Sequence, residues 1–304
     1  MLSSVFLKYH FQASGNLGTV ILEELLKSGL FEVTILIRET SAHTFPPGVK
    51  VVKVDFSNLD SLTNALTGQD ALVSALASLA IASQRLLIDA AVAAGVKRIL
   101  PSEFGNNLKN PKARELPVYA QKIKIEEHLD QLAREGKVSY TLVINGPFLD
   151  WGLKNGMFLD FTNRKIKRYD GGDGLFSTSR LTTVGKAVRR ILTHPRETAD
   201  RAVYVKDIDV SQNQLLKLAQ ALTPGEEWEI EDVKSEDVEK KSREEIERRE
   251  IGKDTMMGFL ARAIWGEGYG ARFEKVHNEV LGIKGMTGPD LEELVASIFG
   301  TEKL

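Results

Sequence analysis

The hydrophobic pattern of the first half of the chain alternates between the two-residue period of strands and the 3.6-residue period of helices. Short aliphatic and β-branched runs predict strands, at residues 4–11, 31–37, 49–54, 71–74, 97–100 and 140–144. Amphipathic stretches between them predict helices, at residues 17–27, 59–66, 83–94 and 119–134. This alternation predicts an α/β fold: a Rossmann-type doubly wound parallel sheet with helices on both faces. In such sheets, ligands bind beyond the carboxyl ends of the strands.

The pattern becomes less regular after residue 150. We expect a turn between short strands at residues 169–174, helices at residues 182–192 and 211–222, and a strand at residues 201–205. A charge-rich solvated helix with its flank is expected at residues 226–250, and a final stretch of short helices and glycine turns at residues 256–299. We expect residues 151–304 to form a smaller α/β substrate-binding domain, with some segments rejoining the sheet.

Composition narrows the classes of function. The chain has 304 residues and a net charge of −2, which gives no electrostatic case for binding nucleic acid or an anionic membrane. It has no cysteine, which excludes disulfides, thiol catalysis and cysteine-bound metals, and its five histidines show no paired ligand spacing. Without a convincing signal peptide or membrane span, we expect a cytoplasmic protein. Monomer and homodimer both remain open.

A glycine-containing loop follows the first expected strand. In "HFQASGNLG" the second and third glycines of a dinucleotide-binding pattern are Gly15 and Gly18. Gln12 occupies the place of the first glycine, and in the tighter form of the pattern that place falls on Ala13. The helix that follows would present free N–H groups to a pyrophosphate. An ordinary strand-to-helix turn also fits two glycines, but the position between a strand and a helix favours a cofactor loop. Its expected contacts are Gln12, Ala13, Ser14, Gly15, Asn16, Leu17 and Gly18.

The end of the second expected strand indicates which dinucleotide binds. An acid there favours the ribose hydroxyls of NAD, whereas an arginine favours the 2′-phosphate of NADP. Arg38 occupies this place, and Glu39 follows it. The alternative for Arg38 is a solvated charge at a strand end. We therefore expect NADP(H) as the cofactor and residues 1–150 as the domain that binds it.

Lys122 is the candidate catalytic residue. It begins an apolar helical stripe that continues through Ile125, Leu129 and Leu132. It either extends along the core surface into solvent or points into a cleft, where a lysine can hold the nicotinamide ribose or act as a general acid or base. Tyr119 lies three residues before it, not the four of the short-chain dehydrogenase Tyr–Lys pair, so that proton route is not supported.

Three aromatic residues and a methionine shortly after residue 147 are candidates for lining an aromatic substrate pocket: Phe148, Trp151, Phe158 and Met157. Ordinary packing between two domains explains each of them equally well.

Several stretches together resemble one known family, the NmrA-like and isoflavone-reductase-like atypical short-chain dehydrogenase/reductases, and in particular its fungal members. The stretches are "ASGNLG", "VTILIRE", "LLIDAAVAAGVKRILPSEFG", "YAQKIKIEEHL", "YTLVINGPFLDW" and "YDGGDGLFSTS". The resemblance covers essentially the whole chain, and "PSEFG" with the lysine downstream is its most specific part. It implies a Rossmann domain that binds NADP(H), with Arg38 at the 2′-phosphate and Lys122 as catalytic acid/base. It also implies contacts from Phe104, Asn145 and Phe148 beside the nicotinamide and substrate.

Two departures from the family limit what the resemblance implies. Plant reductases of the family often carry a basic residue four positions after the lysine, where this chain has Glu126, so their phenylpropanoid substrates are not expected here. The second departure is Gln12 in place of glycine. Lys8 and His10 are also unusual in a strand buried on both faces. One hypothesis is that the first dozen residues are not the native start.

Three functions follow as hypotheses. The leading one is an NADPH-dependent reductase of a small aromatic or polyketide-like carbonyl or conjugated compound, with Lys122 as acid/base. The second is a regulator of the NmrA-like type, which binds the dinucleotide and a protein partner without chemistry. The third is a chain in which Gln12 prevents cofactor binding, since a left-handed non-glycine residue costs about 1–2 kcal/mol.

Overall fold

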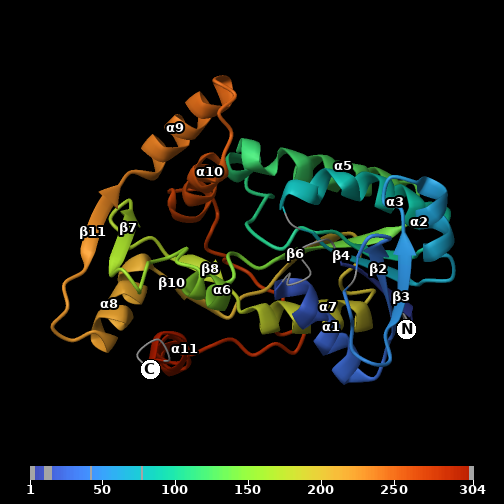
Figure 1. The fold of residues 1–304 in the computed structure, drawn as a ribbon, viewed down its shortest axis with the longest axis horizontal. Helices are drawn as coiled ribbons and strands as arrows, with labels where there is room; N and C mark the ends of the chain where they lie inside the picture. Colours follow the sequence, from blue (N-terminus) through green and yellow to red (C-terminus); the bar gives the residue numbers. More distant parts are fainter. Residues whose placement is uncertain (1–3, 10–15, 42, 77, 301–304) are drawn as a thin grey trace.

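A seven-stranded parallel sheet forms the centre of the computed structural model, which describes residues 4–9, 16–41, 43–76 and 78–300 (Figure 1). The strand order is β3-β2-β1-β4-β5-β6-β9. The strands are β1 (Ser4–Tyr9), β2 (Glu32–Arg38), β3 (Lys50–Val54), β4 (Ala71–Ala75), β5 (Arg98–Leu100), β6 (Ser139–Ile144) and β9 (Arg201–Tyr204). The order reverses between β1 and β4, which is the switch point where such sheets bind ligands. The predicted Rossmann-type sheet is confirmed.

Helices cover both faces of the sheet, and the strands β2, β4, β5 and β6 are buried along most of their length, as is typical of strands covered on both sides. On one face lie α1 (Asn16–Ser28) and α7 (Leu181–Thr193), which pack on each other. On the other lie α2 (Leu59–Leu66), α3 (Gln84–Ala93) and α5 (Ala120–Arg134). Figure 1 shows the two layers below and above the sheet. The predicted helices of the first half agree with these within two residues at each end.

Most of the remaining elements form a second core beside the sheet. Two small sheets contribute: β7 (Lys165–Tyr169) pairs parallel with β11 (Glu229–Val233), and β8 (Phe176–Thr178) pairs antiparallel with β10 (Ile208–Val210). The helices are α6 (Leu149–Lys154), α8 (Gln212–Leu222), α9 (Ser235–Glu247), α10 (Lys253–Trp265) and α11 (Gly288–Phe299). Short helical turns lie at η1 (Ser78–Ser83), α4 (Pro111–Arg114) and η2 (Pro117–Tyr119). Strand β9 pairs with β6 in the main sheet, and helix α7 packs on α1, although both follow residue 150.

The charge-rich stretch 226–250 differs from its prediction. Helix α9 is present, but the stretch also contains β11, which the sequence did not reveal. The charges of β11 pair across the two-stranded sheet: Lys165 with Glu229 at 2.7 Å, and Arg168 with Asp232 at 2.7 Å. Cross-strand ion pairs on a solvated ribbon replace the apolar alternation that normally marks a strand.

Gly146 is a position at which the fold requires glycine. Its φ is +67°, and a Cβ there would lie 2.0 Å from the carbonyl oxygen of Ser177. We predict that Gly146→Ala lowers the free energy of unfolding by about 3 kcal/mol or more, from left-handed strain together with steric overlap. The matched control is Gly95→Ala, where φ is +80° but no atom lies within 4 Å, and where strain alone costs about 1–2 kcal/mol. Urea unfolding of the two variants measures the difference, and equal losses would contradict the close contact.

Candidate active site

Buried polar atoms without a hydrogen-bond partner mark the carboxyl ends of three neighbouring strands. They are Ser74 Oγ at β4, Glu103 Oε1 after β5 and Asn145 Oδ1 after β6. Each of the three residues is at most 4% exposed. Buried polar groups normally have a hydrogen-bond partner, and those without one need an explanation. Three such atoms on one edge of the sheet, at the side where ligands bind, indicate a site that a polar ligand completes.

The loop after β5, Pro101 to Gly105, is tied to the strands on both sides. The Ser102 hydroxyl donates to the carbonyl of Leu76 and accepts from its N–H, both at 2.9 Å. The carbonyl oxygen of Gly105 accepts from the N–H groups of Asn145 at 3.1 Å and Gly146 at 3.0 Å. Between them, Phe104 has a φ of +21°, which is unusual for a non-glycine residue. Strain of this kind persists only where the surroundings enforce it, and it is common at functional sites.

Lys122 reaches this loop from the first turn of α5. Its Nζ donates to the carbonyl of Glu103 and lies 4.0 Å from Glu103 Oε1. Its side chain is 17% exposed. A Cβ on Gly105 would lie 3.5 Å from Nζ, so the ammonium group lies close against the loop backbone. Lys122 therefore points to the edge of the sheet, while Ile125, Leu129 and Leu132 of its stripe are buried as predicted.

Charge around Lys122 is concentrated in two buried carboxyl groups. Burial raises the pKa of Glu103, and the nearby Lys122 ammonium opposes that rise. Glu126, one turn after Lys122, accepts from Lys109 and, at 2.9 Å, from Arg114. The negative charge of Glu126 is thus paired with its own two cations, and Glu103 is left facing Lys122.

Asn145, Phe104 and Phe148 lie with Lys122 around the same strand ends. Asn145 is fully buried, and its Nδ2 donates to the carbonyl of Gly146 at 2.7 Å, which leaves Oδ1 available to accept. Phe104 and Phe148 belong to the same apolar cluster. Three of the residues that the family resemblance implied are therefore gathered near the loop that holds Lys122.

The other aromatic candidates lie in or beside the second core. Phe158 is 2% exposed and stacks on Phe176 with ring centres 5.5 Å apart. A Cβ on Gly152 would lie 2.4 Å from the Phe158 ring, so the ring fills the core under α6. Trp151 is half-buried on α6. Contact of Phe158 with a substrate stays a prediction, and its burial favours a packing role.

The predicted cofactor loop is only partly described. Gln12, Ala13, Ser14 and Gly15 lie outside the described residues. Asn16 and Leu17 open α1, and Gly18 is buried within it. Arg38 is the last residue of β2, the strand next to β1, and is exposed. The described part of the loop and Arg38 lie on neighbouring elements, as a dinucleotide site requires.

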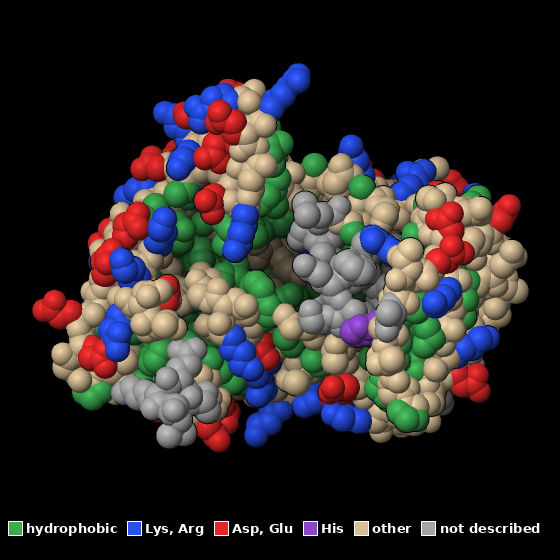
Figure 2. All heavy atoms as spheres, in the orientation of Figure 1, with side chains coloured by type: hydrophobic (Ala, Val, Ile, Leu, Met, Phe, Trp, Pro, Cys, Tyr) green, Lys and Arg blue, Asp and Glu red, His purple; other side chains and the backbone are tan. Residues whose placement is uncertain are grey.

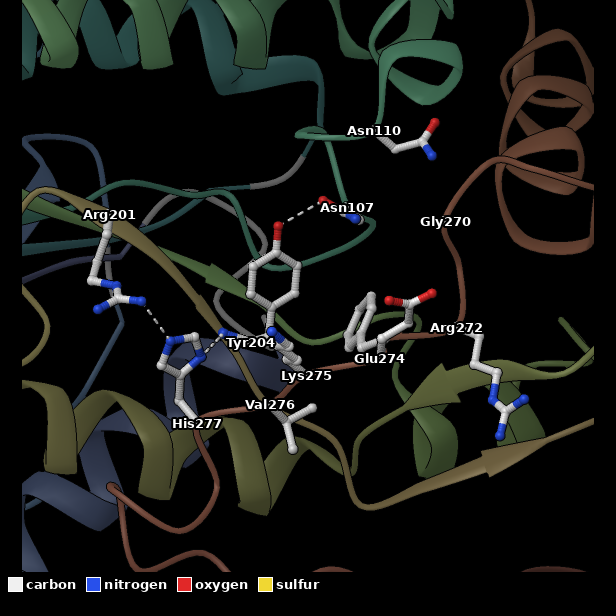
Figure 3. Close-up of a pocket in the computed structure, with 11 residues that line it drawn as sticks. Asn107, Asn110, Arg201, Tyr204, Gly270, Arg272, Glu274, Lys275, Val276 and His277 are labelled. Atoms are coloured by element: carbon white, nitrogen blue, oxygen red, sulfur yellow. Dashed lines mark hydrogen bonds between the residues drawn. The ribbon is translucent and has the colours of Figure 1, made fainter.

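The described part of the molecule has two hollows that could hold a ligand. Figure 2 shows one between the part of the molecule that holds α9 and α10 and the part that holds the sheet, with hydrophobic side chains on its wall. The other is a cavity of about 600 Å³ beside β9 (Figure 3). Its lining residues are Asn107, Asn110, Arg201, Tyr204, Gly270, Arg272, Phe273, Glu274, Lys275, Val276 and His277. None of the predicted site residues belongs to this second cavity.

Two residues of the site were missed by sequence reasoning. Glu103 lies inside the quoted "PSEFG", yet only its neighbour Phe104 was assigned a role. The sequence carried no signal that this acid is buried, because its burial and its position beside Lys122 come from the fold. Ser74 gave no signal either, since a serine within a short apolar strand is common.

Comparisons with known proteins show which family and fold the chain resembles. Residues 10–163 match the model of the NmrA-like family. The chain is 31% identical over 291 residues to oxidoreductase aprR of Aspergillus flavus, covering 94% of this chain and 96% of that protein. Among solved structures, isoflavone reductase is similar with a TM-score of 0.76 and 21% identity, covering 98% and 99% of the two chains. The binary complex of leucoanthocyanidin reductase with NADPH from Vitis vinifera gives 0.78 and 19%, covering 98% and 100%.

In the described part of the chain, no helix is both long and apolar enough to cross a membrane.

The raised pKa of Glu103 predicts a pH dependence of stability. Because the folded state holds this proton more tightly than the unfolded state, the free energy of unfolding falls as pH rises above the ordinary glutamate value of 4.5. Glu103→Gln removes this titration. We therefore expect wild type to lose stability relative to Glu103→Gln as pH rises through the folded pKa. Urea unfolding across this pH range measures it, with the exposed Glu127→Gln as control. A constant difference between wild type and Glu103→Gln would contradict the assignment.

Proposed function

Because the chain belongs to the NmrA-like family, we propose that it is an NADPH-dependent reductase of a small aromatic or polyketide-like carbonyl or conjugated compound. The observation that carries the proposal is the position of Lys122, whose ammonium group lies at the carboxyl end of β5 against Glu103. An oxidoreductase of Aspergillus flavus that aligns with nearly the whole chain supports the reaction class.

The described residues fit a nicotinamide dinucleotide. Asn145 Oδ1 and Ser74 Oγ are buried acceptors without partners at the switch-point side of the sheet, suited to the amide and hydroxyl groups of such a molecule. In this proposal the cofactor is held by Gln12, Ala13, Ser14, Gly15, Asn16, Leu17 and Gly18 at the pyrophosphate. Arg38 contacts the 2′-phosphate, and Phe104, Lys122 and Asn145 lie beside the nicotinamide end. When bound, NADPH supplies the hydride.

Lys122 acts on the oxygen of the substrate in this proposal. Its ammonium group donates a proton, directly or through water, to the oxygen on which negative charge develops. The Glu103 carbonyl holds Nζ in place before the substrate arrives, so little reorganisation is needed during reaction.

Aromatic residues next to this centre set the substrate class. Phe148 precedes α6 and packs in the cluster of Phe104, and Trp151 follows on the same short helix. We propose that Phe148 and Trp151 contact an aromatic substrate, and that Phe158 supports α6 from beneath through Gly152. The buried Glu126 occupies the position at which plant members often carry a base, which argues against plant phenylpropanoid substrates.

We predict that Lys122→Ala lowers kcat by about 10²–10⁴-fold, the usual contribution of a general acid, while NADPH binding is largely retained. The assay follows NADPH oxidation with a panel of aromatic aldehydes, aromatic ketones and enones. The matched control is Lys124→Ala, two residues along α5 and on its exposed side. Unchanged turnover in Lys122→Ala would remove the lysine from the mechanism. NADPH binding without turnover of any compound, together with a stable protein partner, would favour a regulator instead.

The cofactor assignment is tested by calorimetric titration with NADPH and NADH. We predict tighter binding of NADPH by wild type and loss of most of that preference in Arg38→Gln, because a charge-assisted contact to the 2′-phosphate is removed. Gln12→Gly is titrated in parallel. Equal affinities of wild type and Gln12→Gly show that the loop tolerates glutamine, whereas binding only by Gln12→Gly means that the natural chain is impaired. An Arg38→Gln variant that keeps the preference would contradict the role of Arg38.

A further inference from the structure

The cavity beside β9 gathers basic and aromatic side chains that the reductase site does not use (Figure 3). Arg201 begins β9 and Tyr204 ends it, while Phe273, Lys275 and His277 come from the segment after α10. A volume of about 600 Å³ lies in the range of small-molecule sites.

The hydrogen bonds of His277 determine which of its ring nitrogens carries the proton. The backbone N–H of Tyr204 lies 3.1 Å from His277 Nδ1. A backbone N–H can only donate, so Nδ1 must be the accepting nitrogen of the ring. Burial and the nearby Arg201 charge lower the pKa of His277, which favours the neutral ring. In a neutral imidazole whose Nδ1 accepts, Nε2 carries the hydrogen and is a donor.

This tautomer leaves two donors facing each other. Arg201 Nη2 lies 3.0 Å from His277 Nε2, and a guanidinium nitrogen has no acceptor capacity. Two N–H groups at this separation do not form a hydrogen bond with each other. An acceptor group that lies beside both nitrogens would satisfy both, as a carboxylate with two oxygens does.

Charges around the cavity favour a single negative charge. Among the described residues, Arg201 and Lys275 have no carboxylate within 4.0 Å, whereas Arg272 is paired with Asp209 at 3.2 Å. Glu274 also lines the cavity and adds a negative charge to it. Two unpaired cations beside one acid suit a monoanion better than a dianion.

The wall next to the two donors is aromatic. The rings of Tyr204 and Phe273 lie edge to face with centres 5.4 Å apart, and the His277 ring lies 6.2 Å from Tyr204 at an interplanar angle of 16°. Flat rings of this kind favour another ring in stacked or edge-on contact.

We propose that the cavity beside β9 is a binding site for a small aromatic carboxylate. The carboxylate accepts from the Arg201 guanidinium and from His277 Nε2–H, and the aromatic ring packs on Tyr204 and Phe273. The site shares no lining residue with the proposed reductase centre. A hydrogen bond links the two regions: the Tyr204 hydroxyl donates at 2.8 Å to Asn107, two residues after Gly105.

The test uses 4-fluorobenzoate as the probe, observed by fluorine NMR on the full chain, so it does not depend on turnover. We expect saturable binding by wild type, and a Kd raised about tenfold or more in Arg201→Gln, as loss of a charge-assisted hydrogen bond predicts. His277→Asn keeps an acceptor for the Tyr204 N–H but removes the Nε2 donor, and should also weaken binding. Arg196→Gln removes an exposed arginine elsewhere and should leave the Kd unchanged.

Two further probes test separately whether the carboxylate and the aromatic ring are each needed for binding. The neutral 4-fluorobenzyl alcohol should not bind, and inorganic phosphate should not displace 4-fluorobenzoate. Absence of saturable 4-fluorobenzoate binding, or an equal Kd in Arg201→Gln and wild type, would overturn the proposal. Displacement by phosphate at similar concentration would overturn the aromatic class and indicate a simple anion site.

Discussion

The carbonyl oxygen of Gly105 holds the candidate active site together. By accepting two backbone N–H groups from the end of β6, it continues the sheet beyond the three-residue strand β5. This connection positions Glu103 beneath Lys122 and places Asn145 beside them, with its Oδ1 unpaired. One of these two N–H groups belongs to Gly146, a position where only glycine fits because the backbone of Ser177 lies against it. Site geometry and docking of the second core therefore depend on one short stretch of backbone.

The site contains groups that a fold selected for stability alone would avoid. A buried carboxyl oxygen without a partner costs free energy, and so does the positive φ of Phe104. Glu126 forms close ion pairs with Lys109 and Arg114, whereas the ion pair of Glu103 is the longer one to Lys122, at 4.0 Å. Such local conflicts are expected at functional positions, where a ligand or a substrate proton supplies the missing partner.

Sequence periodicity predicted the main sheet and its helices well because their apolar faces are wide and regular, as along α5 and β2. It could not predict β11, whose stability comes from ion pairs across the ribbon with β7 rather than from alternating apolar residues. Lys122 could be recognised from the sequence because it lies on the apolar stripe of its helix. Glu103 could not, because its carboxyl group comes close to the Lys122 ammonium group only when α5 packs against the loop after β5. For Phe158 the sequence left a core role and a substrate-facing role open, because sequence alone does not distinguish the two.

The cavity beside β9 follows from how the sheet protects its edge. An edge strand presents unpaired backbone groups that favour aggregation. Here Tyr204 is capped by His277, whose backbone N–H donates to the Tyr204 carbonyl at 2.7 Å while its Nδ1 accepts from the Tyr204 N–H. Asn278 caps Lys206 through its side-chain amide in a similar way. A histidine used as such a cap must expose its other nitrogen as a donor, whereas an asparagine does not. A histidine next to Arg201 therefore does more than protect the edge strand. Together with the guanidinium group it presents two hydrogen-bond donors to a ligand that can accept from both.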